Sequence, residues 1–190
     1  VAVIILLSDK GTDKGPAGLP PGNEISIGAI VPLTGDAASY GQPLQRSVQM
    51  AVEKINAEGG VAGKQLKVQF EDGKCDGKEG ASAGQKLINI DKVKYILGGA
   101  CSGETLGFAP IAEAAKVIVI SPSATSPDVS NAGDFIFRFA PSDALAGRVA
   151  ARYAYEKLGA RKAAVISENT PYAQGLRKNF QDGFVRAGGA

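Results

Sequence analysis

Short runs of β-branched and aliphatic residues alternate along the chain with longer stretches in which apolar residues recur every three or four positions. The short runs predict strands, and the longer stretches predict helices that bury one face. In chain order the predicted strands are 25–31, 66–71, 95–98, 117–121, 135–139 and 163–167. Strands that alternate with helices are typical of an α/β fold, in which a parallel sheet carries helices on both faces.

The first predicted helix has its apolar residues four, four and three positions apart between Leu44 and Ile55. Pro43 is placed to open this helix, and the Gly-Gly pair at 59–60 is placed to close it. Further helices are predicted at 79–91, around 106–115, at 144–158 and at 173–187. In the third of these five, Pro110 must either begin the regular part or introduce a kink.

The two ends of the chain depart from this alternation. Residues 1–7 read VAVIILL, an unbroken apolar run with no initiator Met and no basic residue before it. A bilayer needs about 20 apolar residues, so we interpret 1–23 as a signal-peptide or anchor remnant with a Gly, Pro and Lys linker. A stray first strand is the alternative. Residues 141–190 supply one strand and two helices, too little to cover a sheet, so we expect an N-terminal fragment.

Composition narrows the function. The chain has 21 Lys plus Arg against 19 Asp plus Glu, and this net charge of +2 creates no field that would attract nucleic acid or an anionic membrane. It contains no His and no Trp, which removes the usual general base and the commonest metal ligand. The Gly-rich stretch 98–103 matches neither the dinucleotide fingerprint nor the phosphate loop. We therefore expect a protein without enzymatic activity, metal or cofactor.

Cys75 and Cys101 are the two cysteines of the chain. An even number of cysteines in a chain with signs of export suggests one disulfide. Such a bond would stabilise the fold by roughly 3 to 4 kcal/mol. Two buried free thiols in a cytosolic protein are the alternative.

Polar loops follow four of the predicted strands, at 32–41, 99–103, 121–127 and 168–172. In an open parallel sheet, ligands bind beyond the carboxyl ends of the strands, where these loops and helix N-termini meet. Unpaired N–H groups at a helix N-terminus can hold a carboxylate if hydroxyl groups complete its shell. Ser102 and Thr125 are placed to supply those hydroxyl groups. Each also has a purely structural interpretation, Ser102 as an N-cap and Thr125 as a turn residue.

Tyr40 and Tyr172 lie in two of these loops and are candidates for the walls of a pocket. The alternative is that each is an ordinary half-buried packing residue. The chain has no Gly-x-Ser-x-Gly elbow, which leaves an α/β hydrolase that uses Ser102 as a minor alternative.

Several motifs resemble one known family. IGAIVPLTGDAASYG, VEKINAEGGVAGKQLKVQFEDGKCD, GGACSGET and SPSATSPD are similar to segments of the periplasmic branched-chain amino-acid-binding proteins of bacterial ABC importers. The similarity runs from about Ile25 to the end of the chain. It implies a type I periplasmic binding fold with two lobes, here an N-terminal lobe at 24–140 and the start of a C-terminal lobe at 141–190.

The resemblance also implies a set of roles. In this family the cysteines that correspond to Cys75 and Cys101 are joined. The first-lobe ligand contacts correspond to Tyr40, Ser102, Ser123, Ala124 and Thr125, and Tyr172 corresponds to a contact from the second lobe. The acid that usually binds the ligand ammonium falls beyond Ala190. The expected partners are a small amino acid or amide and the membrane permease of an ABC importer, and the expected location is periplasmic or otherwise extracytoplasmic, with or without a membrane anchor.

One departure from the family pattern bears on the ligand. Gly103-Glu104 stands where relatives have a more hydroxyl-rich stretch, which brings a carboxylate within one turn of the expected carboxylate site. Like charges there would weaken binding unless Glu104 points away. The leading hypothesis is capture of a branched-chain or related aliphatic amino acid. An amide- or urea-binding relative and the ectodomain of a membrane sensor are the alternatives.

Overall fold

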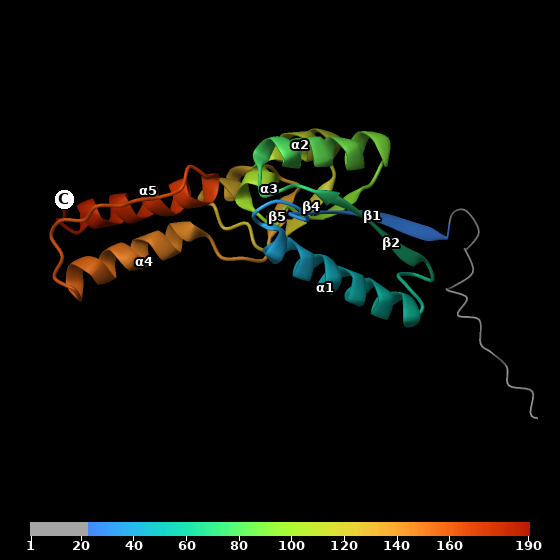
Figure 1. The fold of residues 1–190 in the computed structure, drawn as a ribbon, viewed down its shortest axis with the longest axis horizontal. Coiled ribbons are helices and arrows are strands. Elements are labelled where there is room, and N and C mark those ends of the chain that lie inside the picture. The colour runs from blue at the N-terminus through green and yellow to red at the C-terminus, as the bar shows by residue number, and fades with distance from the viewer. Residues whose placement is uncertain (1–22) are drawn as a thin grey trace, which may run out of the picture.

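The computed structural model describes residues 23–190, and their centre is a parallel sheet of five strands in the order β2-β1-β3-β4-β5 (Figure 1). The predicted remnant at 1–23 lies, apart from its last residue, outside the described residues. The strands are β1 (Glu24–Val31), β2 (Gln65–Asp72), β3 (Tyr95–Gly98), β4 (Ile118–Ser121) and β5 (Ile136–Arg138). All four pairings are parallel. The first five predicted strands and the predicted fold class are confirmed.

Helices cover both faces of the sheet. α2 (Gly77–Gln85) and α3 (Ser102–Ala115) lie on one face, and α1 (Ala38–Ala57) lies on the other (Figure 1). The main core forms under α2 and α3, where Ile30, Leu87 and Phe108 have no exposed surface. A short 3-10 helix, η2 (Pro127–Asn131), contributes the buried Val129 to the same core.

The predicted start of the first helix is wrong. α1 begins at Ala38, and Pro43 lies inside it. The helix starts before Pro43 because backbone carbonyls of the preceding loop accept the N–H groups of its first turn. The N–H of Ala38 donates to the carbonyl of Gly35, and that of Gly41 donates to the carbonyl of Ala37, both at 3.1 Å. Gly41 is the one buried residue of α1, and a side chain there would collide with the carbonyl of Pro32.

The helix predicted at 79–91 consists of two parts. α2 ends at Gln85, and a π-helical segment, η1 (Lys86–Ile90), continues it. Asp76 is the N-cap of α2 and accepts from the N–H groups of Lys78 and Glu79 at 2.7 and 3.1 Å. Pro110 lies within α3 rather than at its start.

The remaining residues form a pair of helices, α4 (Asp143–Glu156) and α5 (Pro171–Arg186), which extends from one end of the sheet (Figure 1). Phe184 is buried between them and packs against Tyr155 and Phe180. The strand predicted at 163–167 is wrong for this structure, because the segment has no neighbouring strand to pair with. Its Ile166 is 99% exposed.

The helix pair contacts the rest of the molecule near η2. The N–H of Asp143 donates to the carbonyl of Thr125 at 2.9 Å, which fixes the start of α4. On α5, a methyl group at Gly175 would lie 2.6 Å from the ring of Pro127, so the glycine permits a close approach. The division into lobes at residue 140 stays a prediction. Among the described residues, no helix has the length and apolar character needed to cross a membrane.

Candidate ligand-binding site

A pocket of about 610 Å³ opens where the loops after β1, β3 and β4 meet the start of α5. It lies beyond the carboxyl ends of the strands, the place where ligands bind in open parallel sheets. The residues that line the pocket are Asp36, Ala37, Tyr40, Cys75, Ala100, Cys101, Ser102, Gly103, Ser123, Thr125, Glu168, Thr170 and Tyr172.

The structure brings five of the six predicted ligand residues together in this pocket: Tyr40, Ser102, Ser123, Thr125 and Tyr172. The sixth, Ala124, is 1% exposed and lies behind the lining. Its N–H donates to Ser121 Oγ at 3.0 Å, so it belongs to the support of the wall.

The N-terminus of α3 forms one side of the pocket. Cys101, rather than Ser102, is the N-cap, which makes the N-cap interpretation of Ser102 wrong. The first N–H groups of a helix have no acceptor within the helix, and here they include those of Ser102 and Gly103, both in the lining. This arrangement suits a carboxylate, because it supplies donors and the positive end of the helix dipole.

The hydroxyl of Ser102 has a structural task. It accepts the N–H of Ser126 at 3.1 Å, and the residue is only 3% exposed. This bond joins the start of α3 to the loop after β4. The described residues place no base beside this hydroxyl, so the geometry gives no support to a role for Ser102 as a nucleophile.

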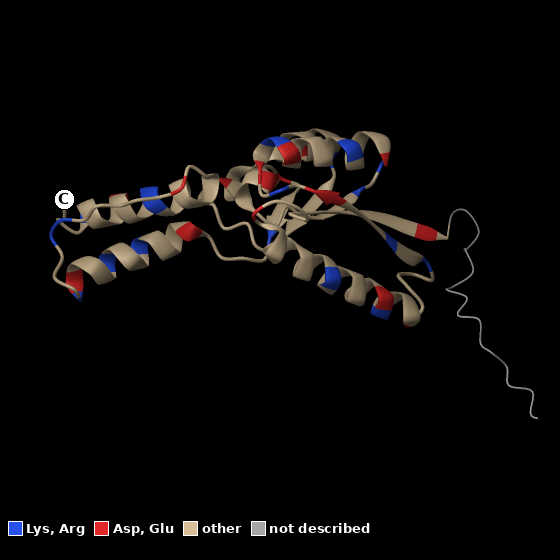
Figure 2. Ribbon diagram, in the orientation of Figure 1, with Lys and Arg blue, Asp and Glu red and all other residues tan. Residues whose placement is uncertain are grey.

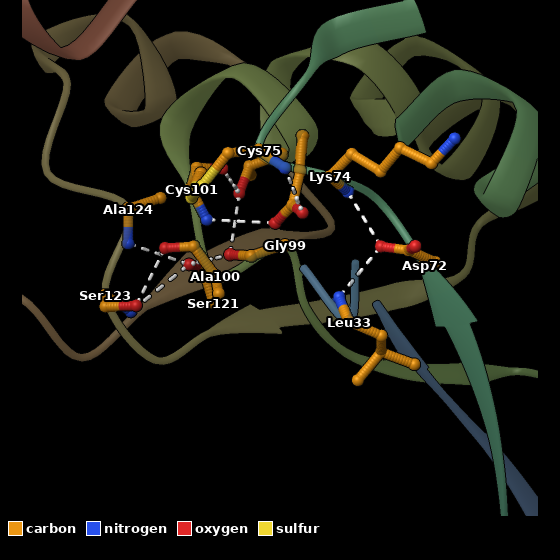
Figure 3. Close-up of a disulfide and its surroundings, with 12 residues drawn as sticks. Leu33, Asp72, Lys74, Cys75, Gly99, Ala100, Cys101, Ser121, Ser123 and Ala124 are labelled. Atoms are coloured by element: carbon orange, nitrogen blue, oxygen red, sulfur yellow. Dashed lines mark hydrogen bonds between the residues drawn. A yellow bond between two sulfur atoms is a disulfide. The ribbon is translucent and has the colours of Figure 1, made fainter. Parts of the chain in front are cut away.

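Serine hydroxyls also join the loops after β3 and β4. Ser121 Oγ donates to the carbonyl of Gly99, and Ser123 Oγ donates to the carbonyl of Ala100, both at 2.7 Å (Figure 3). Ser121 is fully buried, and sequence reasoning did not single it out. A signal was available, because Ser121 is the polar last residue of an otherwise apolar strand.

Cys75 and Cys101 form a disulfide with their Cα atoms 5.1 Å apart, so the alternative of two free thiols is wrong. The bond joins the loop after β2 to the start of α3, and both cysteines line the pocket (Figure 3). Sequence reasoning expected this pair, and the structure adds its place in the wall.

Glu104 points away from the pocket, which answers the question that the sequence raised. It has no exposed surface and is not part of the lining. Its Oε1 accepts the N–H of Cys75 at 2.9 Å, and its Oε2 accepts the N–H of Cys101 at 3.0 Å. Burial raises the pKa of Glu104 above its usual value, and these hydrogen bonds oppose the rise without cancelling it.

Acidic side chains stand at the rim of the pocket. Asp36 and Glu168 are exposed and belong to the lining, which contains neither Lys nor Arg among the described residues. Tyr40 on α1 and Tyr172 on α5 are about half exposed, at 45% and 47%. Sequence reasoning missed both acids as lining residues. The combination of helix N–H groups, hydroxyl groups and rim carboxylates suits a small ligand that carries both charges.

Fold and site together define a class: a solute-binding module built on a parallel sheet, with its pocket at the strand ends. Residues 24–190 match the family model described as periplasmic binding protein. The chain belongs to this family, and its fold is that of the type I periplasmic binding proteins.

A curated relative is the Leu/Ile/Val-binding protein of Escherichia coli K12, which is 32% identical over 86% of this chain and 44% of its own length. A solved structure from Streptococcus pneumoniae, a branched-chain amino acid transporter substrate binding protein in complex with isoleucine, is 36% identical. It matches with a TM-score of 0.75 over 85% of this chain and 47% of that one.

A solute binding protein of an ABC transporter from Rhodopseudomonas palustris, in complex with 3,4-dihydroxybenzoic acid, is 27% identical. Its TM-score is 0.76, over 88% of this chain and 45% of that one. The chain therefore spans about half the length of the relatives it matches. The family is one of solute-binding proteins, and its members among these relatives carry different ligands.

Proposed function

We propose that this chain is part of an extracytoplasmic protein that captures a branched-chain or related aliphatic amino acid for an ABC importer. The observation that carries the proposal is the pocket in which helix N–H groups, hydroxyl groups and two carboxylates converge. Relatives that bind Leu, Ile and Val, or isoleucine, share this fold at 32% and 36% identity.

The proposed orientation of the ligand follows from charge. Its carboxylate accepts hydrogen bonds from the N–H groups of Ser102 and Gly103 and from the hydroxyl of Thr125. Its ammonium group faces the side of Asp36 and Glu168, where no Lys or Arg lines the described pocket. An aromatic acid without an amino group lacks a partner for those two carboxylates, so we propose that a zwitterion is preferred.

The proposed cycle uses two walls of the pocket. Residues 24–140 form the first wall, with Tyr40 at its rim, and residues 141–190 begin the second, with Tyr172. Ligand docks on the first wall, a hinge motion near 140–143 brings the second wall over it, and the permease recognises the closed form. Closure strengthens the polar contacts because it excludes water from the pocket.

The direct test is calorimetry on the full-length protein with leucine, isoleucine, valine, 3,4-dihydroxybenzoate, acetamide and urea. Heat with the aliphatic amino acids and none with the others supports the proposal. Heat with dihydroxybenzoate alone, with the amides alone or with no compound would overturn the ligand class. Acetamide and urea represent the neutral ligands that a carboxylate beside the site would favour. Glu104 points away from the pocket, so that argument for a neutral ligand is weaker.

The variant Thr125→Val tests the orientation, because it removes the hydroxyl and keeps the shape of the side chain. We expect isoleucine to bind about tenfold more weakly, which corresponds to about 1.4 kcal/mol. Thr34→Val is the matched control, since Thr34 bonds to Asp72 and lies outside the pocket lining. Equal isoleucine affinities for the two variants would show that the Thr125 hydroxyl does not bind the ligand.

A membrane-anchored sensor is the second candidate function, favoured by the apolar run at 1–7. Fractionation of cells that express the full-length protein separates the two. Recovery with the membrane, together with a signalling domain in the remaining sequence, would favour the sensor, and recovery in the soluble fraction would favour a free binding protein.

A further inference from the structure

Glu104 is a fully buried carboxyl group that the proposed ligand contacts do not use. Glutamate is almost never fully buried unless it is paired. The two oxygens of Glu104 reach two different segments: Oε1 accepts from the N–H of Cys75 at 2.9 Å and Oε2 from the N–H of Cys101 at 3.0 Å. These are the segments that the disulfide also joins.

Three glycines make room for Glu104. A methyl group at Gly73 would lie 2.5 Å from Glu104 Oε1, and one at Gly80 would lie 2.7 Å from Glu104 Cα. At Gly99 a methyl group would collide with Glu104 Cβ and would lie 3.0 Å from Oε2. Real Cβ atoms do not come this close, so Gly73 and Gly99 leave room for the side chain of Glu104, and Gly80 lets α2 approach its backbone.

We propose that Glu104 is a positioning residue of the ligand pocket. Its carboxyl group holds the loop at 73–76 against the first turn of α3, in parallel with the Cys75–Cys101 disulfide. Both cysteines line the pocket, as do Ser102 and Gly103, so the two connections fix the same wall. The inference rests on the proposed function, because it takes this pocket to be the ligand site.

Two parallel connections predict redundancy. Either one alone keeps the N–H groups of Ser102 and Gly103 in place, so loss of one changes ligand affinity little. Loss of both frees the loop at 73–76 from α3, and the wall loses its preorganised form. The pair should therefore be strongly non-additive, as residues that share one task are.

The test is calorimetry with isoleucine on the full-length wild-type protein and on Glu104→Gln, each oxidised and reduced with a phosphine, with thiol counting to verify reduction. Because the glutamine oxygen can keep the bond to Cys75, Glu104→Leu, which accepts neither N–H, is measured in the same four-way comparison and carries the expected loss. We expect about a threefold loss of affinity or less from reduction or substitution alone, and a loss of roughly thirtyfold or more from both together. If the affinity loss from reduction and substitution together equals the product of the two separate losses, the proposal is overturned.

Glu113→Gln is the matched control. Glu113 lies on the same helix, its Oε2 accepts the N–H of Phe135 at 3.0 Å, and it also lies against a glycine, Gly133. It is outside the pocket lining. Its replacement should lower stability and leave affinity unchanged in both redox states, and an affinity loss after reduction equal to that of the reduced Glu104 variant would indicate a merely structural effect.

Amide hydrogen exchange on the reduced, ligand-free wild-type protein tests the connection without a ligand or a variant. We expect the amides of Cys75 and Cys101 to exchange at least tenfold more slowly than the same amides in an unfolded chain. Fast exchange at both overturns the proposal, including where Glu104→Gln does not fold. If the wild-type protein binds none of leucine, isoleucine and valine, the proposed function fails, and the exchange rates still decide whether Glu104 holds the wall.

Discussion

Two regions of the molecule differ in how fully they bury their apolar residues. The first is the sheet with α1, α2 and α3, and the second is the helix pair α4–α5. In the first region Ile30, Leu87 and Phe108 have no exposed surface, because helices on one face and neighbouring strands enclose them. In the second region Leu145, Val149 and Tyr153 are about half exposed, at 57%, 48% and 56%, although they recur every four residues. Apolar periodicity establishes which face a helix will bury, and a partner is needed before burial occurs.

The exposed Ile166 lines a groove of about 570 Å³ between α4, α5 and the segment at 164–168. A single aromatic cluster around Phe184 holds the two helices together. Charges are spread over both regions, as Figure 2 shows, so electrostatics does not account for the difference. The difference lies in the number of layers that enclose the apolar face.

The variant Phe108→Ala should cause the largest loss of stability, and it should destabilise the first region. Phe108 has no exposed surface and packs against Gly84, so its truncation leaves a cavity. We expect a loss of about 3 to 5 kcal/mol in the free energy of unfolding, measured with urea. Phe139→Ala is the control, since Phe139 is 83% exposed, and a comparable loss in both would contradict the assignment of the core.

Phe184→Ala should come next, with a loss of about 3 kcal/mol that is confined to the second region. Phe184 is 2% exposed and stacks on Phe180 with ring centroids 5.6 Å apart. Hydrogen exchange should speed up in α4 and α5 and stay unchanged in β1 and β3. Equal acceleration in both regions would show that the two unfold as one unit.

Asp72→Asn should reduce the pH dependence of the first region. Burial alone would raise the pKa of Asp72, but hydrogen bonds from Thr34, Leu33 and Lys74 outweigh it and hold the pKa below its usual value. The folded state therefore binds fewer protons than the unfolded chain. The stability from Asp72 is complete above the unfolded pKa of about 3.9 and is lost as pH falls through the folded pKa.

Urea midpoints between about pH 6 and about pH 3 measure this effect. The wild-type midpoint should fall over this range, and Asp72→Asn should fall less steeply after a loss of about 1 kcal/mol at neutral pH. Asp134→Asn, at an exposed position, controls for the removal of one negative charge. A steeper fall for Asp72→Asn than for the wild type would show that the sign is wrong.

Ile166→Ser should have the smallest effect, within about 0.5 kcal/mol for the chain of 190 residues. Ile166 is 99% exposed, so the substitution removes no buried surface. If the same substitution costs about 2 kcal/mol or more in the full-length protein, further sequence covers the groove. No loss in either form would mean that the groove stays open.

Pattern alone established the α/β class, the parallel sheet, the first five strands and the loops that carry the pocket. This was possible because the spacing of apolar residues and the turn residues of a segment can be read from that segment alone. Residue chemistry suggested the disulfide and four site residues, and the resemblance added Ser123 and Ala124. The structure brings five of these six residues into one lining. The assignment of these residues to ligand contacts stays a prediction.

Only tertiary contacts decided the rest. The segment at 163–167 has a strand pattern and no strand beside it, and Pro43 lies inside a helix that loop carbonyls extend toward its N-terminus. The direction of Glu104 depends on the room left by glycines at 73 and 99, which are distant in sequence and meet only in the fold. A side chain's orientation is set by the free space and the hydrogen-bond partners that other segments supply, and no local pattern records these.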